Sequence, residues 1–367
     1  MLDPDAPPLR IALVTLGDPT RLTGGYLYHW RIAALAPRHG ARIDFVSFPD
    51  WPFPLARLAT RRVSREVRTV RADAVLLDSI AAAFYRRRRR ARTAEPPVVA
   101  ILHQPPGGIG HGRLRTALQA RLDRSGYAAA SRMLVASGAL GAELAAAGFA
   151  PERLVVAEPG RDVAERADPP PGDLRQGRAI TLLFVGNWLA PKGLLDLLEA
   201  VAALPEPAAT LHLAGDDRAD LEYAARVRAR LASPDLAGRV VNHGKLARSA
   251  VAALYAAADA FVLPAVKETY GTVYGEAMAA GLPVVGWRAG NLPNLATHEV
   301  EGLILEPGDR RALTAALARL AADEALRRRL GAAARLRAQA FPTWDETAAL
   351  VVSTIAGVVA SARAAER

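Results

Sequence analysis

The 367-residue chain contains no cysteine, and its first lysine is Lys192. The lack of cysteine excludes a disulfide scaffold, a zinc site built from thiolates and a cysteine nucleophile, and it favours a reducing compartment. Aromatic residues make up only 6% of the chain, whereas hydrophobic residues make up 51% and charged residues 23%. These proportions exclude a disordered chain, and the length allows two ordinary globular domains.

Features of export or membrane insertion are also scarce. The N-terminus is acidic and proline-rich, unlike a secretory signal. The most apolar late stretch, residues 347–362, is shorter than the roughly 20 residues that a membrane-spanning helix needs. We therefore expect a cytoplasmic protein whose last helix is buried.

The excess positive charge lies in the first half of the chain. Residues 1–178 contain 27 arginines and 17 acidic residues, whereas the remainder has 20 of each sign. A basic amphipathic surface suits anionic lipid headgroups at the inner face of a membrane, and a plain solvated surface is the alternative. Aromatic residues are not interleaved with the arginines, which argues against nucleic acid. The arginines in question are Arg61, Arg62, Arg65, Arg68, the run 86–90 with Arg92, and Arg113, Arg115, Arg121 and Arg124.

Short apolar runs alternate with longer amphipathic stretches along the whole chain. This rhythm predicts parallel sheets with helices on both faces. It stops at residues 163–178, a polar segment with three consecutive prolines that suits an interdomain linker. We expect domains at 1–162 and 179–342, and a last helix at 343–367 that crosses back to the first domain. The expected strands are residues 9–16, 42–48, 74–77, 97–103, 132–136, 154–157, 180–185, 210–214, 240–242, 260–263, 283–286 and 302–305.

Two carboxylates, Glu268 and Glu276, stand eight positions apart after the apolar run 260–263. Gly271 marks a helix start between them. The N-terminus of a helix binds phosphate through its unpaired N–H groups and its dipole. Carboxylates on either side of it can accept hydrogen bonds from sugar hydroxyls. From the spacing alone, two solvated glutamates beside a tight turn remain an alternative.

This segment resembles the E-x7-E motif of retaining GT-B glycosyltransferases, in particular family 4. The resemblance covers nearly the whole chain, in order. It implies an α/β fold of the GT-B type, with two doubly wound Rossmann-like domains facing a central cleft, the first for the acceptor and the second for a nucleotide sugar. The other segments that carry it are residues 23–26, 101–105, 135–137, 158–162, 184–193, 213–217, 243–246, 289–292 and 301–309.

The resemblance also implies roles for residues of the donor site. Glu276 binds the nucleotide ribose, Glu268 binds donor-sugar hydroxyls, and Lys192 neutralises the diphosphate as the bond to it breaks. Catalytic roles fall on His103, Lys192 and Glu268. The backbone groups that approach the sugar, the phosphates or the base belong to Gly24, Gly25, Gly186, Gly244, Lys245, Leu246, Tyr270, Gly271, Thr272 and Val273.

The acceptor half is harder to read from the sequence. His103 is expected near the reacting carbon and the acceptor hydroxyl. His29, His111 and Ser137 are further acceptor-side candidates. No motif in the sequence identifies the acceptor, although a lipid or a glycan fits the resemblance.

One position departs from the family pattern. Asn187 stands where the family usually has an arginine, so one positive charge is missing beside the expected diphosphate. Lys192 or Arg161 is the candidate to compensate for it. No Asp-x-Asp metal signature ends a strand, and Lys192 with the helix N-terminus takes the place of a metal. We therefore expect no metal or other cofactor.

These features favour a retaining, metal-independent glycosyltransferase that uses an NDP-sugar, with UDP the commonest nucleotide in the family. A sugar-nucleotide epimerase and a non-catalytic nucleotide-sugar-binding protein of the same fold are the alternatives. An epimerase needs acidic and basic groups converging on the sugar from both domains, and only His103 is a clear candidate. The non-catalytic reading is motivated by Asn187.

Overall fold

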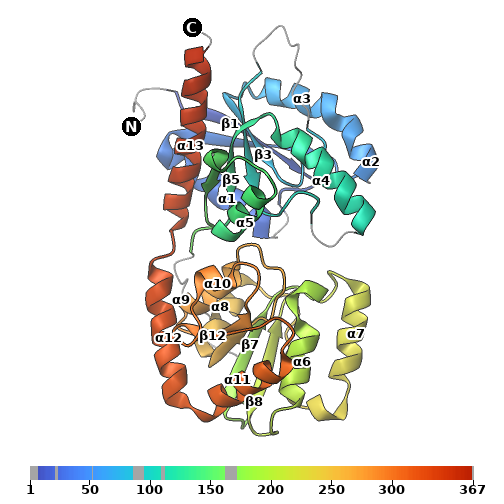
Figure 1. Cartoon of the computed structure of the whole chain (residues 1–367), viewed down its shortest axis with the longest axis vertical. Coiled ribbons are helices and arrows are strands. Elements are labelled where there is room, and N and C mark those ends of the chain that lie inside the picture. Colours follow the sequence, from blue (N-terminus) through green and yellow to red (C-terminus); the bar gives the residue numbers. More distant parts are fainter. Residues whose placement is uncertain are drawn as a thin grey trace. The chain divides into compact units, whose positions relative to one another are not determined.

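The structure is a computed structural model that describes residues 7–20, 24–51, 53–85, 95–108, 112–161 and 172–365. It divides into two compact units, Met1–Gly160 with Pro342–Arg367, and Arg161–Phe341 (Figure 1). His111, the arginines 86–90 and 92, and the first part of the expected linker lie outside the described residues.

The N-terminal unit is built on a six-stranded parallel sheet with the strand order β2-β1-β3-β4-β5-β6. Its strands read as continuous apolar runs because they are buried on both faces, as parallel sheets usually are. The strands are β1 (Leu9–Leu16), β2 (Ala41–Phe48), β3 (Ala74–Asp78), β4 (Val98–Leu102), β5 (Ala130–Val135) and β6 (Leu154–Val156).

Alternate residues of these strands feed two separate cores. Ile11 and Leu13 point to the face covered by α1 (Gly24–Leu35) and α13 (Trp344–Ala365). Ala12 and Val14 point to the opposite face and its helices, as the two-residue period of a strand requires. Those helices are α2 (Phe53–Ala56), α3 (Thr60–Thr69), α4 (Arg113–Tyr127) and α5 (Gly138–Ala146), and three short 3₁₀ turns, η1 (Ala36–His39), η2 (Arg57–Ala59) and η3 (Pro151–Arg153), join the elements.

The last helix corrects one expectation. Its apolar stretch belongs to α13, which is 22 residues long, so by length and composition alone this helix could cross a membrane. One face of α13 is nevertheless buried, through residues such as Val351, Val352 and Ile355. These side chains join the core beneath the sheet, and α13 runs beside α1 (Figure 1).

The C-terminal unit contains a second six-stranded parallel sheet, with the order β12-β11-β10-β7-β8-β9. Its strands are β7 (Ile180–Val185), β8 (Ala209–Ala214), β9 (Val240–Asn242), β10 (Ala260–Val262), β11 (Val284–Trp287) and β12 (Gly302–Leu305). Its helices and turns are η4 (Ala190–Lys192), α6 (Leu194–Ala202), α7 (Leu221–Leu231), η5 (Pro234–Leu236), α8 (Arg248–Ala257), α9 (Thr272–Ala279), α10 (Leu292–Leu295), α11 (Arg310–Ala322) and α12 (Glu324–Gln339).

All twelve expected strands are confirmed, and their ends differ by at most two residues. Each sheet also has a switch point, where consecutive strands are laid down in opposite directions. It lies between β1 and β3 in the N-terminal unit and between β7 and β10 in the C-terminal unit. In doubly wound sheets, ligands bind outside the carboxyl ends of the strands at this point. A ligand site is therefore expected at the loops that follow these strands.

Candidate active site at the two switch points

In the C-terminal unit, two loops meet at the switch point. One follows β7 and ends in η4, and the other follows β10 and leads to α9. The amide of Val266 donates a hydrogen bond to the carbonyl oxygen of Pro191, with N and O 2.9 Å apart. Gly193 has φ +70°, and a Cβ there would overlap the carbonyl oxygen of Pro264. A glycine is needed at this position because both the conformation and the close contact exclude a side chain.

This packing brings Lys192 and Glu268 together from 76 positions apart in the chain. The Lys192 ammonium donates a hydrogen bond to Glu268 Oε2 and forms an ion pair with it. Both side chains are partly exposed, at 21% and 16%. The two residues expected to contact the diphosphate and the sugar therefore touch each other, within reach of solvent.

The helix α9 begins directly after this loop. Its N-cap is Gly271, with φ +84°, a residue that has no side chain to cap the helix. Glu276 lies one turn into the helix. Burial, followed by the charge of Glu276 and a hydrogen bond to it, raises the pKa of Tyr255 well above its ordinary value. The expectation of a loop glutamate, a glycine helix start and a second glutamate one turn later is confirmed.

Asn291 fixes the loop that carries Glu268, a function that the sequence did not reveal. Its side chain is fully buried and donates a hydrogen bond to the carbonyl oxygen of Tyr270, with N and O 2.9 Å apart. Its backbone N–H donates to the carbonyl oxygen of Glu268 at 2.9 Å. The preceding Gly290 has φ +58°. The glycine–asparagine pair is typical of a turn and was the available signal.

The ends of β7, β8 and β9 each carry a glycine. Gly186 donates its N–H to the carbonyl oxygen of Ala214, and Gly215 donates to that of Gly244, each with N and O 2.9 Å apart. Asn187 is exposed, and its Oδ1 accepts a hydrogen bond from the Asp216 backbone at 3.2 Å. Its carbonyl group thus joins two loops. Lys245 is exposed and Leu246 half-buried, one and two positions after Gly244.

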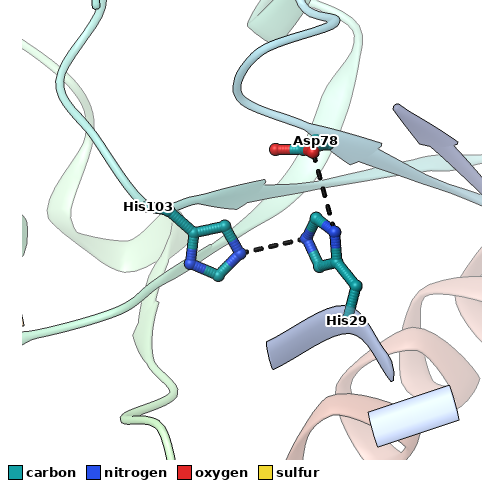
Figure 2. Close-up of side chains that lie close together, drawn as sticks. All are labelled: His29, Asp78 and His103. Carbon is teal, nitrogen blue, oxygen red and sulfur yellow. Dashed lines mark hydrogen bonds and ion pairs between the residues drawn. The ribbon is translucent and has the colours of Figure 1, made fainter. Parts of the chain in front are cut away.

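In the N-terminal unit, three ionisable side chains converge at the other switch point. Figure 2 shows the His29 ring between Asp78 and His103. His29 Nε2 lies 3.0 Å from His103 Nε2, and His29 Nδ1 lies 3.6 Å from Asp78 Oδ2. One ligand atom from each residue lies within 4.8 Å of the others, a spacing that a metal ion can use. The sequence predicted both histidines separately but neither their contact nor the part played by Asp78.

The cluster is embedded in the protein. His29 is 0% exposed and Asp78 2% exposed, whereas His103 is half-buried. Burial lowers the pKa of His29 to about 3. Burial, with a smaller contribution from His29, lowers the pKa of His103 to about 3 as well. Burial raises the pKa of Asp78, against the opposing effects of His103 and of hydrogen bonds from Thr15, Ile80 and Ser79. Both histidines are therefore neutral at neutral pH.

Both halves of the chain match family models for the same kind of enzyme. Residues 10–165 match "Glycosyltransferase Family 4", and residues 179–323 match "Glycosyl transferases group 1". The chain belongs to the GT-B glycosyltransferases. The two switch-point sites described above thus lie one in each of its matched domains.

Curated relatives of this GT-B chain cover only part of it. The D-inositol 3-phosphate glycosyltransferase of Xylanimonas cellulosilytica is 32% identical over 217 residues, which are 56% of this chain and 51% of the relative. The N-acetyl-alpha-D-glucosaminyl L-malate synthase of Bacillus anthracis is 32% identical over 155 residues, 42% of this chain and 39% of the relative. The chain thus spans about half the length of the curated relatives that it matches.

Solved structures resemble this GT-B chain over nearly its full length. The sucrose-phosphate synthase of Thermosynechococcus elongatus has a TM-score of 0.82 at 20% identity and covers 96% of this chain and 100% of its own. Anabaena HepE in complex with UDP and glucose has a TM-score of 0.73 at 20% identity, covering 94% and 99%. At this identity the likeness establishes the fold.

Three other residues expected in the site of this GT-B chain have distinct surroundings. A Cβ on Gly25 would lie 3.6 Å from the His103 ring, so α1 begins beside that histidine. Ser137 is fully buried, and its Oγ caps α5 by accepting a hydrogen bond from Leu140 at 3.2 Å. Arg161 donates to the carbonyl oxygen of Phe341 at 3.1 Å.

Proposed function

We propose that this chain is a retaining glycosyltransferase that transfers a sugar from a nucleoside diphosphate sugar, most commonly of UDP, to an acceptor hydroxyl. The observation that carries the proposal is the contact between Lys192 and Glu268 at the switch point, directly before the N-terminus of α9, which begins after Gly271. A cation, a helix N-terminus and a carboxylate side by side suit a phosphate joined to a polyol.

The proposed roles follow from charge. Lys192 stabilises the diphosphate as negative charge develops on it during cleavage of the bond to the sugar. The N–H groups of Thr272 and Val273 at the start of α9 add a fixed dipole. Glu268 accepts hydrogen bonds from sugar hydroxyls, and Glu276 accepts them from the ribose. In this proposal Lys192 and α9 perform the work that a metal does in other transferases, so turnover persists in EDTA.

The neutral side chain of Asn187 makes the proposed role of Lys192 at the diphosphate more important. A neutral side chain whose carbonyl oxygen already accepts from Asp216 adds no positive charge to the leaving group. Lys192 then supplies the cationic contact alone, and its removal affects catalysis more than in a site with two cations. An Asn187→Arg variant adds the missing charge and binds nucleoside diphosphate more tightly. Unchanged or weaker binding in that variant would refute this view of Asn187.

Product analysis tests the proposed reaction. The full chain is incubated with UDP-, GDP- and ADP-sugars, with and without candidate acceptors, which include a polyol phosphate and a hydroxy acid like those in the names of the relatives. Proton NMR then gives the anomeric configuration of the product. We expect acceptor-dependent donor consumption with an unchanged configuration. An inverted product would refute the retaining mechanism, and an epimerised donor without acceptor would indicate the alternative activity.

We also propose that the N-terminal unit contacts an anionic membrane surface. Helix α4 has an unusual distribution, because it buries Gln119 and Asp123 while Leu114 is 90% exposed and Leu118 is 54% exposed. Exposed arginines flank these leucines in the sequence of α4, and α3 carries further exposed arginines. Exposed apolar side chains among cations suit a lipid headgroup layer. The arginines exposed on the two helices are Arg61, Arg62, Arg65, Arg68, Arg113, Arg115, Arg121 and Arg124.

Co-sedimentation with vesicles of phosphatidylglycerol and phosphatidylcholine tests this contact. Binding is expected at low salt and is weaker at high salt because salt screens the arginines. Replacing both Leu114 and Leu118 by serine weakens it further, whereas Leu336→Ser, at a 69% exposed leucine of the C-terminal unit, leaves it unchanged. Failure to bind anionic vesicles at low salt would exclude the contact.

A further inference from the structure

The facing nitrogens of His29 and His103 restrict where their protons lie. Both rings are neutral, so each carries one N–H group and one lone pair. The two Nε2 atoms are 3.0 Å apart, a hydrogen-bond distance. Two lone pairs would repel each other at this distance, and two N–H groups would collide. One nitrogen therefore donates and the other accepts.

Asp78 determines which nitrogen donates. Its Oδ1 accepts from the backbone N–H of Ile80 at 3.3 Å and from the Ser79 hydroxyl at 3.2 Å. Its Oδ2 accepts from the Thr15 hydroxyl at 2.6 Å. A carboxylate that receives three donors is held as an acceptor. The same Oδ2 lies 3.6 Å from His29 Nδ1, a buried nitrogen with no hydrogen-bond partner among the described residues. Oδ2 is thus the acceptor that this nitrogen faces, and we place the His29 proton on Nδ1.

The proton position on His29 Nδ1 determines the proton positions on the other ring nitrogens of the pair. With Nδ1 protonated, the neutral His29 ring has its lone pair on Nε2. His103 must then donate its Nε2–H, which leaves the lone pair of His103 on Nδ1. Figure 2 shows this second nitrogen pointing away from His29. Among the described residues none hydrogen-bonds to this nitrogen, and His103 is half-buried, not closed off.

The His103 ring is also held in its plane. Tyr28 packs edge-on against it, with ring centroids 4.8 Å apart, and Tyr28 in turn packs against Trp344 of α13 at 5.5 Å. The backbone N–H of His103 donates to Ser79 Oγ at 3.4 Å. The position of its lone pair is thus fixed by packing as well as by hydrogen bonds.

We infer that Asp78 and His29 are positioning residues that hold His103 in the Nε2–H form, so that its Nδ1 lone pair accepts a hydrogen bond from the acceptor's nucleophilic hydroxyl. This inference rests on the proposed transferase function. It assigns the acceptor to compounds that offer an O–H to His103. A carboxylate at the same point has no proton to give and is repelled by the lone pair.

Nitrogen-15 NMR of the full chain tests the proton positions without reference to activity. Histidine-labelled protein is compared with His29→Gln and His103→Gln variants to assign the signals. Two other histidines serve as internal references for the Nε2–H form. His212 Nε2 lies 2.9 Å from the Leu174 carbonyl oxygen, which can only accept, and His298 Nδ1 accepts from the Ile304 N–H at 3.0 Å. We expect His103 to match these references and His29 to show the opposite form.

Two spectral outcomes would overturn the inference. One is His103 protonated on Nδ1. The other is a change in the His29 and His103 signals on adding EDTA, because a bound metal ion and not a proton would then join the two nitrogens. A Thr15→Val variant keeps the Asp78 carboxylate and is expected to keep the wild-type pattern. Asp78→Asn can donate to His29 Nδ1, and is expected to reverse it.

Kinetics separate this inference from the proposed function. With an acceptor that the wild type uses, Asp78→Asn is expected to lower kcat for transfer by about tenfold or more, without changing the KM for the donor. If Asp78→Asn shows the reversed proton positions in NMR and still has the kcat of the wild type, the role of the His103 tautomer is refuted while the transferase function remains intact. A wild type inactive on every donor would refute the proposed function, while the NMR result would still decide the proton positions.

Discussion

The buried His29 makes the N-terminal unit sensitive to acid, and this sensitivity can be calculated. The pKa of His29 is about 3 in the folded protein, because the side chain is 0% exposed. In the unfolded chain the pKa returns to 6.5. As the pH falls below 6.5, the unfolded chain binds a proton that the folded protein does not. The contribution of His29 to stability is therefore complete above pH 6.5 and is lost as the pH falls toward 3.

The expected loss is large on the scale of protein stability. Each pH unit below 6.5 lowers the free energy of unfolding by about 1.4 kcal/mol for this one group. Between pH 7 and pH 5 the loss from His29 alone is about 2 kcal/mol. At pH 5 the folded His29 is still neutral, so this value depends on the unfolded pKa.

Urea denaturation at the two pH values measures this effect in the wild type and in His29→Gln. His103 and every other ionisable group remain in both proteins, so the difference between their pH dependences reports the titration of His29 together with its smaller effect on the pKa of His103. Tyr28→Phe is the matched control, since it removes the hydrogen bond to the Ala157 carbonyl oxygen and costs about 1 kcal/mol at both pH values. Its pH dependence is expected to equal that of the wild type. An equal pH dependence in His29→Gln would refute the assignment of acid sensitivity to His29.

Two further predictions concern the loops of the C-terminal unit. Gly193→Ala is expected to lower the free energy of unfolding by about 3 kcal/mol in thermal denaturation, whereas Gly238→Ala lowers it by about 1 kcal/mol. Both glycines have positive φ, but a Cβ at Gly238 meets nothing within 4 Å. Equal losses of stability would therefore contradict the close contact with Pro264. Asn291→Ala is expected to lower the free energy of unfolding by about 1–3 kcal/mol, because the Tyr270 carbonyl oxygen loses its buried partner. The same variant is expected to bind UDP more weakly in calorimetry. UDP affinity equal to that of the wild type would show that the hydrogen bonds of Asn291 to the Glu268 loop do not matter for the donor.

The strands could be predicted from the sequence because parallel strands buried on both faces are continuous apolar runs. The Glu268 loop and the start of α9 could be predicted because glycine marks the turn and the two glutamates lie close together in the chain. The last helix could also be predicted, since it was expected at residues 343–367 and α13 extends from Trp344 to Ala365. Arg363 near its end pairs with Asp73 of the same unit.

Contacts between residues far apart in the chain could not be predicted from the sequence. His29, Asp78 and His103 come from a helix and two strand ends, and only the order β1-β3-β4 brings them together. The strand containing Asp78 was expected to end one residue earlier. The hydrogen bond of Asn187 could not be predicted either, because the backbone N–H that donates to its Oδ1 belongs to Asp216, on the loop after β8. In each case the missing information was the sheet order, which local patterns do not contain.

Calorimetric titration with UDP tests the central claim, that Lys192 holds the donor diphosphate at the switch point of the C-terminal unit. A charge-assisted hydrogen bond to phosphate contributes about 1.5–3 kcal/mol, so Lys192→Ala is expected to weaken UDP binding by at least about tenfold. Lys267→Ala removes the same charge from an exposed residue beside Glu268 and is expected to bind UDP as the wild type does. UDP affinity in Lys192→Ala equal to that in Lys267→Ala would contradict the account.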